Sequence, residues 1–283
     1  MDGILLINKE QDWTSRDVCN RCQNIFSTKK VGHTGTLDPF ATGLLVVTLN
    51  KANKIAQFLD DYTKTYVAVL KLGSKTSTGD VTGEVIDTKE VPALNEDNIK
   101  EILSKFVGEI EQVPPMTSAV HHEGRKLYEL YYEGKTVERE KRKAFVYDIK
   151  LISFNEDEIV FEATVKRGTY IRVLGEDIAE KLNTLGHLTS LNRTKIGPFD
   201  VKDARKIGEI TKDINLISIY DALSFIPTYK VYGDVIKKVK DGMRLTLREY
   251  SSDFVFVASG DNEPIAIYEK SEPGKYKCRR GLW

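Results

Sequence analysis

The chain has 283 residues, 41% of them hydrophobic, and its 42 basic and 42 acidic side chains give a formal net charge of zero. This length predicts one large and one small domain with ample apolar content for a core, and the balanced charge argues against a uniformly basic nucleic-acid-binding surface, so that any RNA contact must come from local patches. No apolar run approaches the ~20 residues that span a bilayer and the N-terminus lacks a signal-peptide pattern, so we expect a cytoplasmic protein without a membrane segment.

The first 72 residues alternate short apolar strands with helices. Strands are predicted over 4–7, 44–48 and 66–72, and helices over 14–26 and around 55–59. The strand over 66–72 is apolar on both faces, which is typical of an interior strand. Because no second pair of Cys or His follows Cys19 and Cys22 at zinc-ligand spacing, we interpret both as core cysteines and predict no metal site.

Turn residues and alternating patterns divide the middle of the chain. Gly, Ser, Thr and Asp are dense over 73–84, which predicts a loop. Asn95 or Asp97 is a suitable N-cap for a following amphipathic helix. A hairpin of two strands is predicted over 145–154 and 158–166, and a helix opens at Gly168. The main domain is therefore expected to mix α and β structure.

The segment 114–143 combines a helix-like run of tyrosines with basic residues. Three tyrosines follow Arg125 and Lys126 closely, and Arg142 lies in a basic run at the end of the segment. Aromatic and cationic side chains mixed in this way can bind RNA by stacking and by phosphate contact. Interspersed glutamates dilute the positive charge, so composition by itself leaves a solvated helix as an equal alternative.

The sequence pattern changes after Pro227 to short strands of alternating polarity. Two alternating apolar strands over 254–258 and 264–268 flank a Gly-Asp-Asn-Glu turn, and a basic strand with Lys277 and Arg279 follows. About fifty residues are few for a self-sufficient core, so we expect a small β-barrel docked on the main domain. The expected domains are therefore 1–226 and 227–283.

The most informative motif covers residues 31–45, Val-Gly-His-Thr-Gly-Thr-Leu-Asp-Pro-Phe-Ala-Thr-Gly-Leu-Leu. It sets Asp38 in a loop of glycines and threonines just before an apolar run. Pro39 biases Asp38 toward extended or turn torsions, so its carboxylate is presented rather than folded into a helix face. The glycines allow close approach by a ligand. Without the rest of the motif, Asp38 would read as an incidental loop residue.

This run resembles the catalytic motif of the TruB family, the tRNA pseudouridine-55 synthases. Further resemblances follow in family order at Lys64-Thr65-Tyr66, Thr117-Ser118-Ala119, Gly124-Arg125-Lys126-Leu127-Tyr128, Lys166-Arg167-Gly168-Thr169-Tyr170-Ile171-Arg172 and Gly186-His187-Leu188-Thr189-Ser190-Leu191-Asn192-Arg193-Thr194. They span about residues 3 to 199, with one departure at Lys9-Glu10, where the family usually has Lys-Pro. The resemblance implies an α+β pseudouridine-synthase fold with a mostly antiparallel mixed sheet, an RNA-binding insertion over 114–143 and a PUA-like C-terminal β-barrel.

The resemblance also implies roles for individual residues. Asp38 would be the essential carboxylate, and Arg172 would form an ion pair with it. Tyr66 would stack on the target base, Tyr170 would lie beside it, and Leu191 would pack against it. Taken alone, Tyr66 and Leu191 would instead be core side chains, and Arg172 would be a solvated charge on a helix.

Three further site candidates are weaker. His33 would fill the space that a flipped uridine vacates, although a lone loop histidine is ordinarily solvated. Asp80 matches a family acid near the site and is equally well a turn former, and Lys9 is a site candidate by position. The RNA-binding candidates outside the site are Arg125, Lys126, Arg142, Lys277 and Arg279.

The expected activity is isomerisation of uridine to pseudouridine in the T-loop of tRNA, by a monomer that uses no cofactor. Asp38 could attack C1′ of the sugar, attack C6 of the base, or remove a proton from C2′, and the sequence leaves all three open. Three other functions also stay open: a guide-RNA-dependent relative, a non-catalytic RNA-folding protein, and a carboxylate-dependent nucleoside or glycoside hydrolase.

Overall fold

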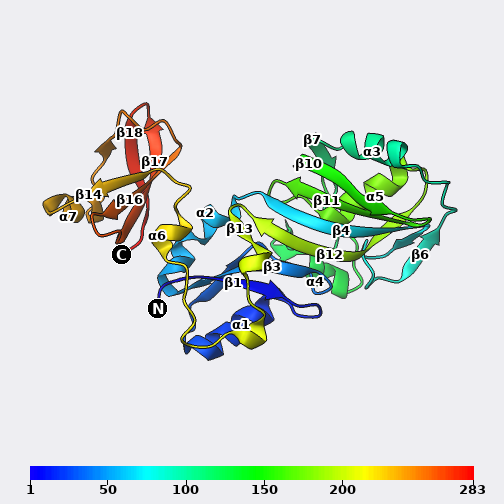
Figure 1. Cartoon of the computed structure of the whole chain (residues 1–283), viewed down its shortest axis with the longest axis horizontal. Coiled ribbons are helices and arrows are strands. Elements are labelled where there is room, and N and C mark those ends of the chain that lie inside the picture. The colour runs from blue at the N-terminus through cyan, green and yellow to red at the C-terminus, as the bar shows by residue number, and fades with distance from the viewer.

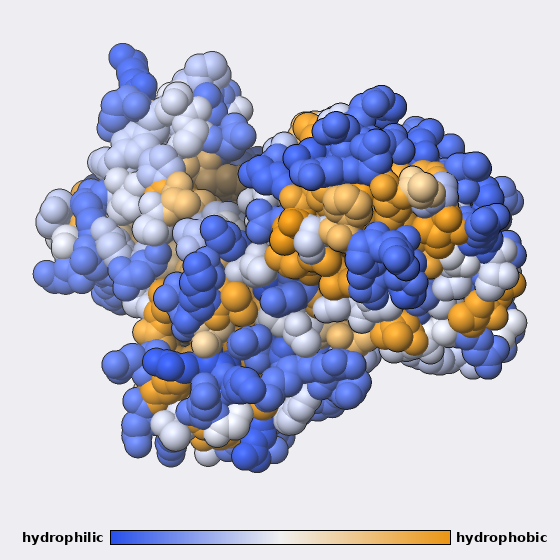
Figure 2. Space-filling model, turned by 45° about the vertical axis from the view of Figure 1, so that its right-hand side comes forward, coloured by the Kyte–Doolittle hydropathy of each residue, from blue (hydrophilic) through white to orange (hydrophobic).

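The computed structural model describes residues 1–283, and its strands form two main sheets in separate lobes of the chain (Figure 1). The space-filling view shows apolar residues gathered over the lobe of the larger sheet, interrupted by hydrophilic ones, and a hollow between this lobe and the C-terminal one (Figure 2). No helix in the structure combines the length and the apolar character needed to cross a membrane.

The larger sheet has nine strands: β1 (Gly3–Lys9), β2 (Val31–Thr34), β3 (Thr42–Leu49), β4 (Lys64–Leu72), β7 (Gly108–Gln112), β10 (Arg142–Phe154), β11 (Glu158–Val165), β12 (Gly186–Ile196) and β13 (Phe199–Asp200). Their order is β1-β3-β12-β4-β11-β10-β7, with β2 paired to β3 and β13 paired to β12. All pairs are antiparallel except β12 with β3. The predicted α+β fold with a mostly antiparallel mixed sheet is therefore confirmed.

The parallel contact between β3 and β12 is short and divides the larger sheet into two antiparallel halves. Only Thr42 with Asn192 and Gly43 with Arg193 are in register there. Gly43 has φ +102°, and a Cβ at this position would lie 2.4 Å from the carbonyl oxygen of Arg193. Only glycine therefore lets the two strands meet, and the loop that carries Asp38 enters β3 at this joint.

Helices cover the two halves separately (Figure 1). Helix α1 (Ser15–Phe26) begins at a capping box of Thr14 and Asp17 and packs on the half that contains β1. Its Cys19 and Cys22 are fully buried, as predicted for core cysteines. Helices α3 (Glu96–Ser104), capped by Asn95, and α5 (Ile171–Lys181) pack against the other half in one apolar cluster. The remaining short helices are η1 (Asn50–Ile55), α2 (Ala56–Asp60), α4 (Leu127–Tyr132), η2 (Val201–Asp203), η3 (Ile207–Glu209) and α6 (Ile219–Ala222).

Several local predictions were wrong. The predicted loop over 73–84 contains β5 (Ser74–Thr76), which pairs with β6 (Val85–Thr88), because a three-residue strand is too short to show alternation. Arg125 and Lys126 form β9 (Arg125–Lys126) against β8 (His121–His122) rather than a helical turn. Gly168 has φ +84° and turns the chain, so the helix begins three residues later at Ile171.

The C-terminal sheet is a curled half-barrel of five strands: β14 (Thr228–Val231), β15 (Leu245–Thr246), β16 (Phe254–Ser259), β17 (Pro264–Glu272) and β18 (Lys275–Gly281). The helix α7 (Asp234–Lys240) was not predicted. Phe256, Ile267 and Leu282 share an apolar cluster with Phe58 and Ile226 of the preceding lobe. This shared cluster attaches the small sheet to the rest of the chain.

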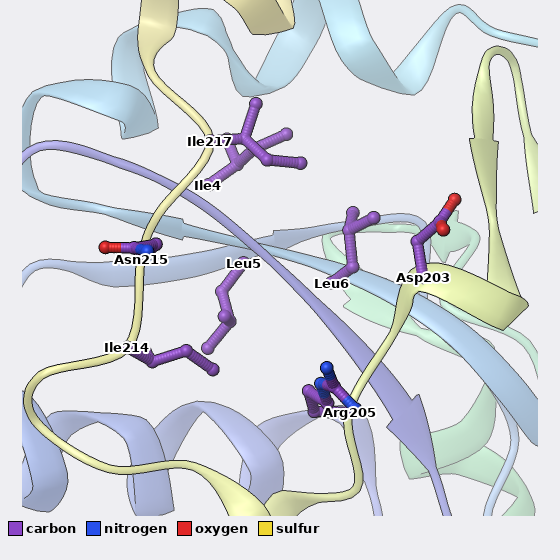
Figure 3. Close-up of a pocket in the computed structure, with 8 residues that line it drawn as sticks. All are labelled: Ile4, Leu5, Leu6, Asp203, Arg205, Ile214, Asn215 and Ile217. Atoms are coloured by element: carbon purple, nitrogen blue, oxygen red, sulfur yellow. The ribbon is translucent and has the colours of Figure 1, made fainter.

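The segment 201–217 returns along the outer edge of β1. Ile4 and Ile217 exchange backbone hydrogen bonds, and the backbone N–H of Arg205 donates to the carbonyl of Leu6. A pocket opens between these contacts, lined by Ile4, Leu5, Leu6, Asp203, Arg205, Ile214, Asn215 and Ile217 (Figure 3). None of the predicted site residues lines this pocket, so it is not evidence for ligand binding at the predicted site.

Candidate active site

Asp38 lies in the loop between β2 and β3, next to the joint of the two half-sheets. Leu37, Phe40 and Ala41 on either side of it are buried and anchor the loop in the core. The hydroxyl of Ser15 at the start of α1 accepts a hydrogen bond from the backbone N–H of Leu37 at 2.9 Å. The Asp38 side chain keeps 33% of its area exposed. The loop is therefore fixed by its neighbours while its carboxylate still reaches solvent.

Arg172 in the first turn of α5 joins Asp38 to Asp80. Its Nε lies 3.2 Å from Asp38 Oδ2, and its Nη1 lies 3.0 Å from Asp80 Oδ2. The guanidinium also donates to the carbonyl of Thr78 at 3.0 Å and to the hydroxyl of Thr117 at 2.6 Å. These partners hold the buried Arg172 in one orientation, with one edge toward Asp38.

Asp80 is itself fixed before it meets Arg172. The hydroxyls of Thr78 and Thr82 donate to its Oδ1 at 2.9 and 2.5 Å, and the backbone N–H of Thr82 donates at 3.0 Å. Asp80 is 2% exposed, so its other oxygen is directed at the arginine rather than at water. The residue closes a turn and also orients Arg172.

Lys9 binds the Asp38 loop through backbone atoms. Its buried Nζ donates to the carbonyls of Glu10 at 3.0 Å, Trp13 at 2.6 Å and Pro39 at 3.2 Å. Burial lowers the pKa of Lys9 to about 8, and the nearby Asp38 carboxylate limits the fall. Lys9 therefore contributes a positive charge near Asp38 without forming an ion pair with it.

The ionisation of Asp38 is set by opposing effects. Burial raises the pKa of Asp38, and the adjacent Arg172 guanidinium opposes this rise. Asp80 raises the pKa further, whereas Lys9 and Arg193 lower it. The positive charges around the loop thus oppose the rise in the pKa of Asp38 that burial causes.

Tyr66 and Leu191 lie in the same apolar cluster as Leu37 and Phe40. They sit on the adjacent strands β4 and β12, with Tyr66 8% and Leu191 6% exposed. Tyr170 precedes α5, and its backbone N–H and carbonyl are bonded by the side-chain amide of Gln112 at 3.0 and 3.1 Å. The structure therefore places Tyr66 and Leu191 in one apolar cluster with the residues that flank Asp38, and it fixes the backbone of Tyr170 just before the helix that carries Arg172.

His33 extends this group along β2. Its Nδ1 is buried and has no hydrogen-bond partner. Burial lowers the pKa of His33, and Arg193 lowers it further, so the ring is neutral at pH 7.

The predicted RNA-binding residues lie away from this group. Arg125 forms an ion pair with Glu133, and Lys126 lies 5.5 Å from the ring centre of Tyr128. Arg142 on β10 and Lys277 and Arg279 on β18 are exposed, as is Arg125 on β9. None of the five forms a hydrogen bond or ion pair with Asp38 or Arg172, and the segment 114–143 reaches the site through Thr117 instead.

Three residues at the site were not singled out from the sequence. Thr117 and Gln112 position Arg172 and Tyr170, and Arg193 donates to the backbone of the Asp38 loop. Thr117 and Arg193 lie within the segments that resemble the family motifs, but the sequence of such a segment does not indicate which of its side chains point into the site. Gln112 carried no signal, because its short strand β7 was not predicted.

Chains of solved structures share this fold. A chain of a Cbf5-Nop10-Gar1 complex superposes with a TM-score of 0.75 at 23% identity, covering 99% of this chain and 85% of that one. A chain of an H/ACA RNP bound to a substrate RNA containing 2′-deoxyuridine also gives 0.75, at 21% identity and the same coverage. These likenesses show the fold. Residues 23–171 match the profile described as TruB family pseudouridylate synthase (N terminal domain). The sequence therefore defines a pseudouridine synthase, which is an isomerase.

Curated relatives agree with the profile. The protein named tRNA pseudouridine synthase B from Hydrogenovibrio crunogenus is 40% identical over 251 residues, 88% of this chain and 83% of the relative. Its namesake from Chromohalobacter salexigens is 40% identical over 250 residues, 86% of this chain and 81% of the relative. This chain belongs to the TruB family.

Proposed function

We propose that this chain converts the T-loop uridine of tRNA, the target of pseudouridine-55 synthases, into pseudouridine, with Asp38 as the essential carboxylate. The main support is the Asp38–Arg172 ion pair at 3.2 Å in a loop otherwise fixed by buried neighbours. Relatives named tRNA pseudouridine synthase B, about 40% identical over most of the chain, support tRNA as the substrate.

The reaction rearranges one nucleoside without a net change in redox state. The N1–C1′ bond of uridine breaks, the uracil turns, and a C5–C1′ bond forms. N1 gains a proton, and the proton on C5 leaves to solvent. All atoms other than exchanged protons are retained, so the step needs no external electron donor.

Asp38 would act as the ionised group in this rearrangement. Attack on C1′, attack on C6 and removal of the C2′ proton all require a carboxylate rather than a carboxylic acid. Arg172 favours the ionised form and fixes its direction. The apolar wall that includes Leu191 would keep water from trapping the separated base and sugar.

The other site residues would hold the base in the cleft. A uridine in a folded loop must be flipped out, which costs a few kcal/mol of unstacking. Tyr66 and Tyr170 would hold the flipped base by stacking and edge contact, and the neutral His33 would occupy the space left behind.

We assign catalysis to residues 1–226 and further RNA contact to two other regions. The insertion over 114–143, with Arg125, Lys126 and Arg142, would contact the tRNA arm beside the cleft. Residues 227–283 would be a PUA-like RNA-binding domain that presents Lys277 and Arg279 from β18. We expect the single chain to act on tRNA without a guide RNA or a protein partner.

The test is tritium release from tRNA labelled at C5 of uridine. Wild type should release tritium, Asp38→Asn should release none while binding tRNA with unchanged affinity, and the control Asp213→Asn, at an exposed aspartate, should behave as wild type. Binding without release by the wild type would refute stand-alone catalysis and favour a guided or RNA-folding protein. Release of free uracil would instead indicate a hydrolase.

A further inference from the structure

Arg193 on β12 is the side chain whose burial the site described so far leaves unexplained. It is 1% exposed and ranks among the largest fully buried side chains of the chain. None of the ion pairs in the structure, up to 4.0 Å, includes it. A guanidinium that leaves water without a carboxylate partner carries a large desolvation cost, so its position calls for a compensating role.

The hydrogen bonds of Arg193 go to the two ends of the Asp38 loop. Its Nη2 donates to the carbonyl of Gly35 at 2.9 Å, and its Nε donates to the carbonyl of Leu44 at 2.8 Å. Gly35 directly follows β2, and Leu44 lies inside β3, so Asp38 lies between the two bonded residues. One rigid guanidinium thus joins the start of the loop to its end.

The same side chain also contacts the strand on the other side of β12. Its guanidinium carbon lies 6.0 Å from the ring centre of Tyr66, within the range of a cation–π contact. The backbone of Arg193 is in register with Tyr66 on β4 and with Gly43 on β3. Arg193 is therefore the point at which both halves of the larger sheet and the Asp38 loop meet.

We propose that Arg193 is a positioning residue for the isomerase reaction: it fixes the Asp38 loop relative to Tyr66 and places an unneutralised positive charge beside that loop. This inference rests on the proposed function, because it takes Asp38 as the reacting carboxylate and Tyr66 as the base-stacking ring. Arg172 sets the direction of the carboxylate itself, whereas Arg193 sets the backbone that carries it.

The geometry requires arginine rather than any cation. Nε and Nη2 of one planar group reach two carbonyls, one directly after β2 and one inside β3, and the ammonium of lysine is a single point donor on a flexible stem. Arg193→Lys would therefore keep the charge and lose at least one of the two bonds. Arg193→Met would lose the charge and both bonds while keeping an unbranched side chain.

The two variants separate positioning from charge in steady-state tritium release from full-length tRNA. We expect Arg193→Lys to lower kcat about tenfold to a hundredfold with KM within about threefold, because the loss is in alignment rather than binding. Arg193→Met should lower kcat further and move the acid limb of the pH–rate profile to higher pH. The direction follows because Arg193 lowers the pKa of Asp38.

A matched variant controls for loss of stability. Phe161→Leu removes volume from a fully buried side chain on β11 in the apolar cluster that also contains Tyr66, and β11 pairs with β4 and β10 rather than with β3 or β12. We expect it to lower the melting temperature with kcat and the pH profile unchanged. If the Arg193 variants, assayed well below their melting temperatures, keep the wild-type kcat and pH profile as this control does, Arg193 is structural and the proposal fails.

Hydrogen exchange supplies a readout that does not depend on activity. In Arg193→Lys the amides of residues 35–44 and of β4 should exchange faster than in wild type, with the C-terminal sheet unchanged as an internal reference. Unchanged exchange over 35–44 would overturn the proposal. A different result is faster exchange over 35–44 in Arg193→Lys together with no tritium release by the wild type. That result would support the contact between Arg193 and the loop and would refute the proposed function instead.

Discussion

Gly43→Ala tests the joint between the two halves of the larger sheet. A Cβ at Gly43 would lie 2.2 Å from Asn192 Oδ1, and 2.4 and 2.8 Å from the backbone oxygen and nitrogen of Arg193. Two of these three atoms are backbone, so they cannot turn aside as the end of a flexible side chain would. The added methyl group must therefore push β12 away from β3, where the strands share only two residue pairs.

The expected destabilisation has two parts. A residue with a Cβ at the positive φ of +102° costs about 1–2 kcal/mol. Forcing a methyl group into a filled site costs about 1–3 kcal/mol more. The sum is about 2–5 kcal/mol, and proteins of roughly this size lose about 2–4 °C in Tm for each kcal/mol.

Urea unfolding followed by far-UV circular dichroism measures the loss, and Gly108→Ala is the matched control. Gly108 has φ +110° and no atom within 4 Å of an added Cβ, so this variant carries the backbone cost alone. The difference between the two variants isolates the overlap with β12. Equal midpoints for both variants would refute the account of the joint. Tritium release should also be slower in Gly43→Ala, because β3 and β12 separate at the joint where the Asp38 loop enters β3.

Three other outcomes follow from the same geometry. The rate of tritium release should fall at acid pH as Asp38 is protonated, with a pKa above its ordinary 3.8, and it should fall again above about pH 8 as Lys9 loses its proton. A pH–rate profile of Lys9→Met that still falls above about pH 8 would contradict the assignment to Lys9. Asp80→Ala should lower the free energy of unfolding by about 3–5 kcal/mol, measured in urea, since it removes the buried partner that orients Arg172; an unchanged midpoint would show that the pair is dispensable. In native protein an aromatic disulfide reagent should modify at most the half-buried Cys278, because burial raises the pKa of the two α1 thiols to about 11 and 12; reaction of all three without denaturant would refute this.

Regular elements with enough length were predictable from the chain. The helix α1 carries both an apolar face and a capping box, and β4, β10 and β11 alternate or are apolar over eight or more residues. The strands β5, β7 and β8 are five residues or fewer and give no periodic signal. They form because neighbouring strands offer backbone partners, which is a tertiary effect.

The residues of the candidate site were likewise predictable only in part. The motif with Asp38 and the segment with Arg172 could be found in the sequence, and the structure brings them to 3.2 Å. The burial of Asp80 and the bonds from Thr117 and Gln112 could not be found, because each depends on which strand lies beside which.

The family of this protein, the loop that presents Asp38 and the periodic elements around it could be inferred from the amino-acid sequence, because these depend on residue identity over short spans. The joint of the sheet at Gly43 and Arg193, and the buried guanidinium without a carboxylate partner that spans it, follow from tertiary packing. The burial of that charge and the two carbonyl groups that accept its hydrogen bonds depend on strands that are far apart in the chain, so no local sequence pattern predicts them.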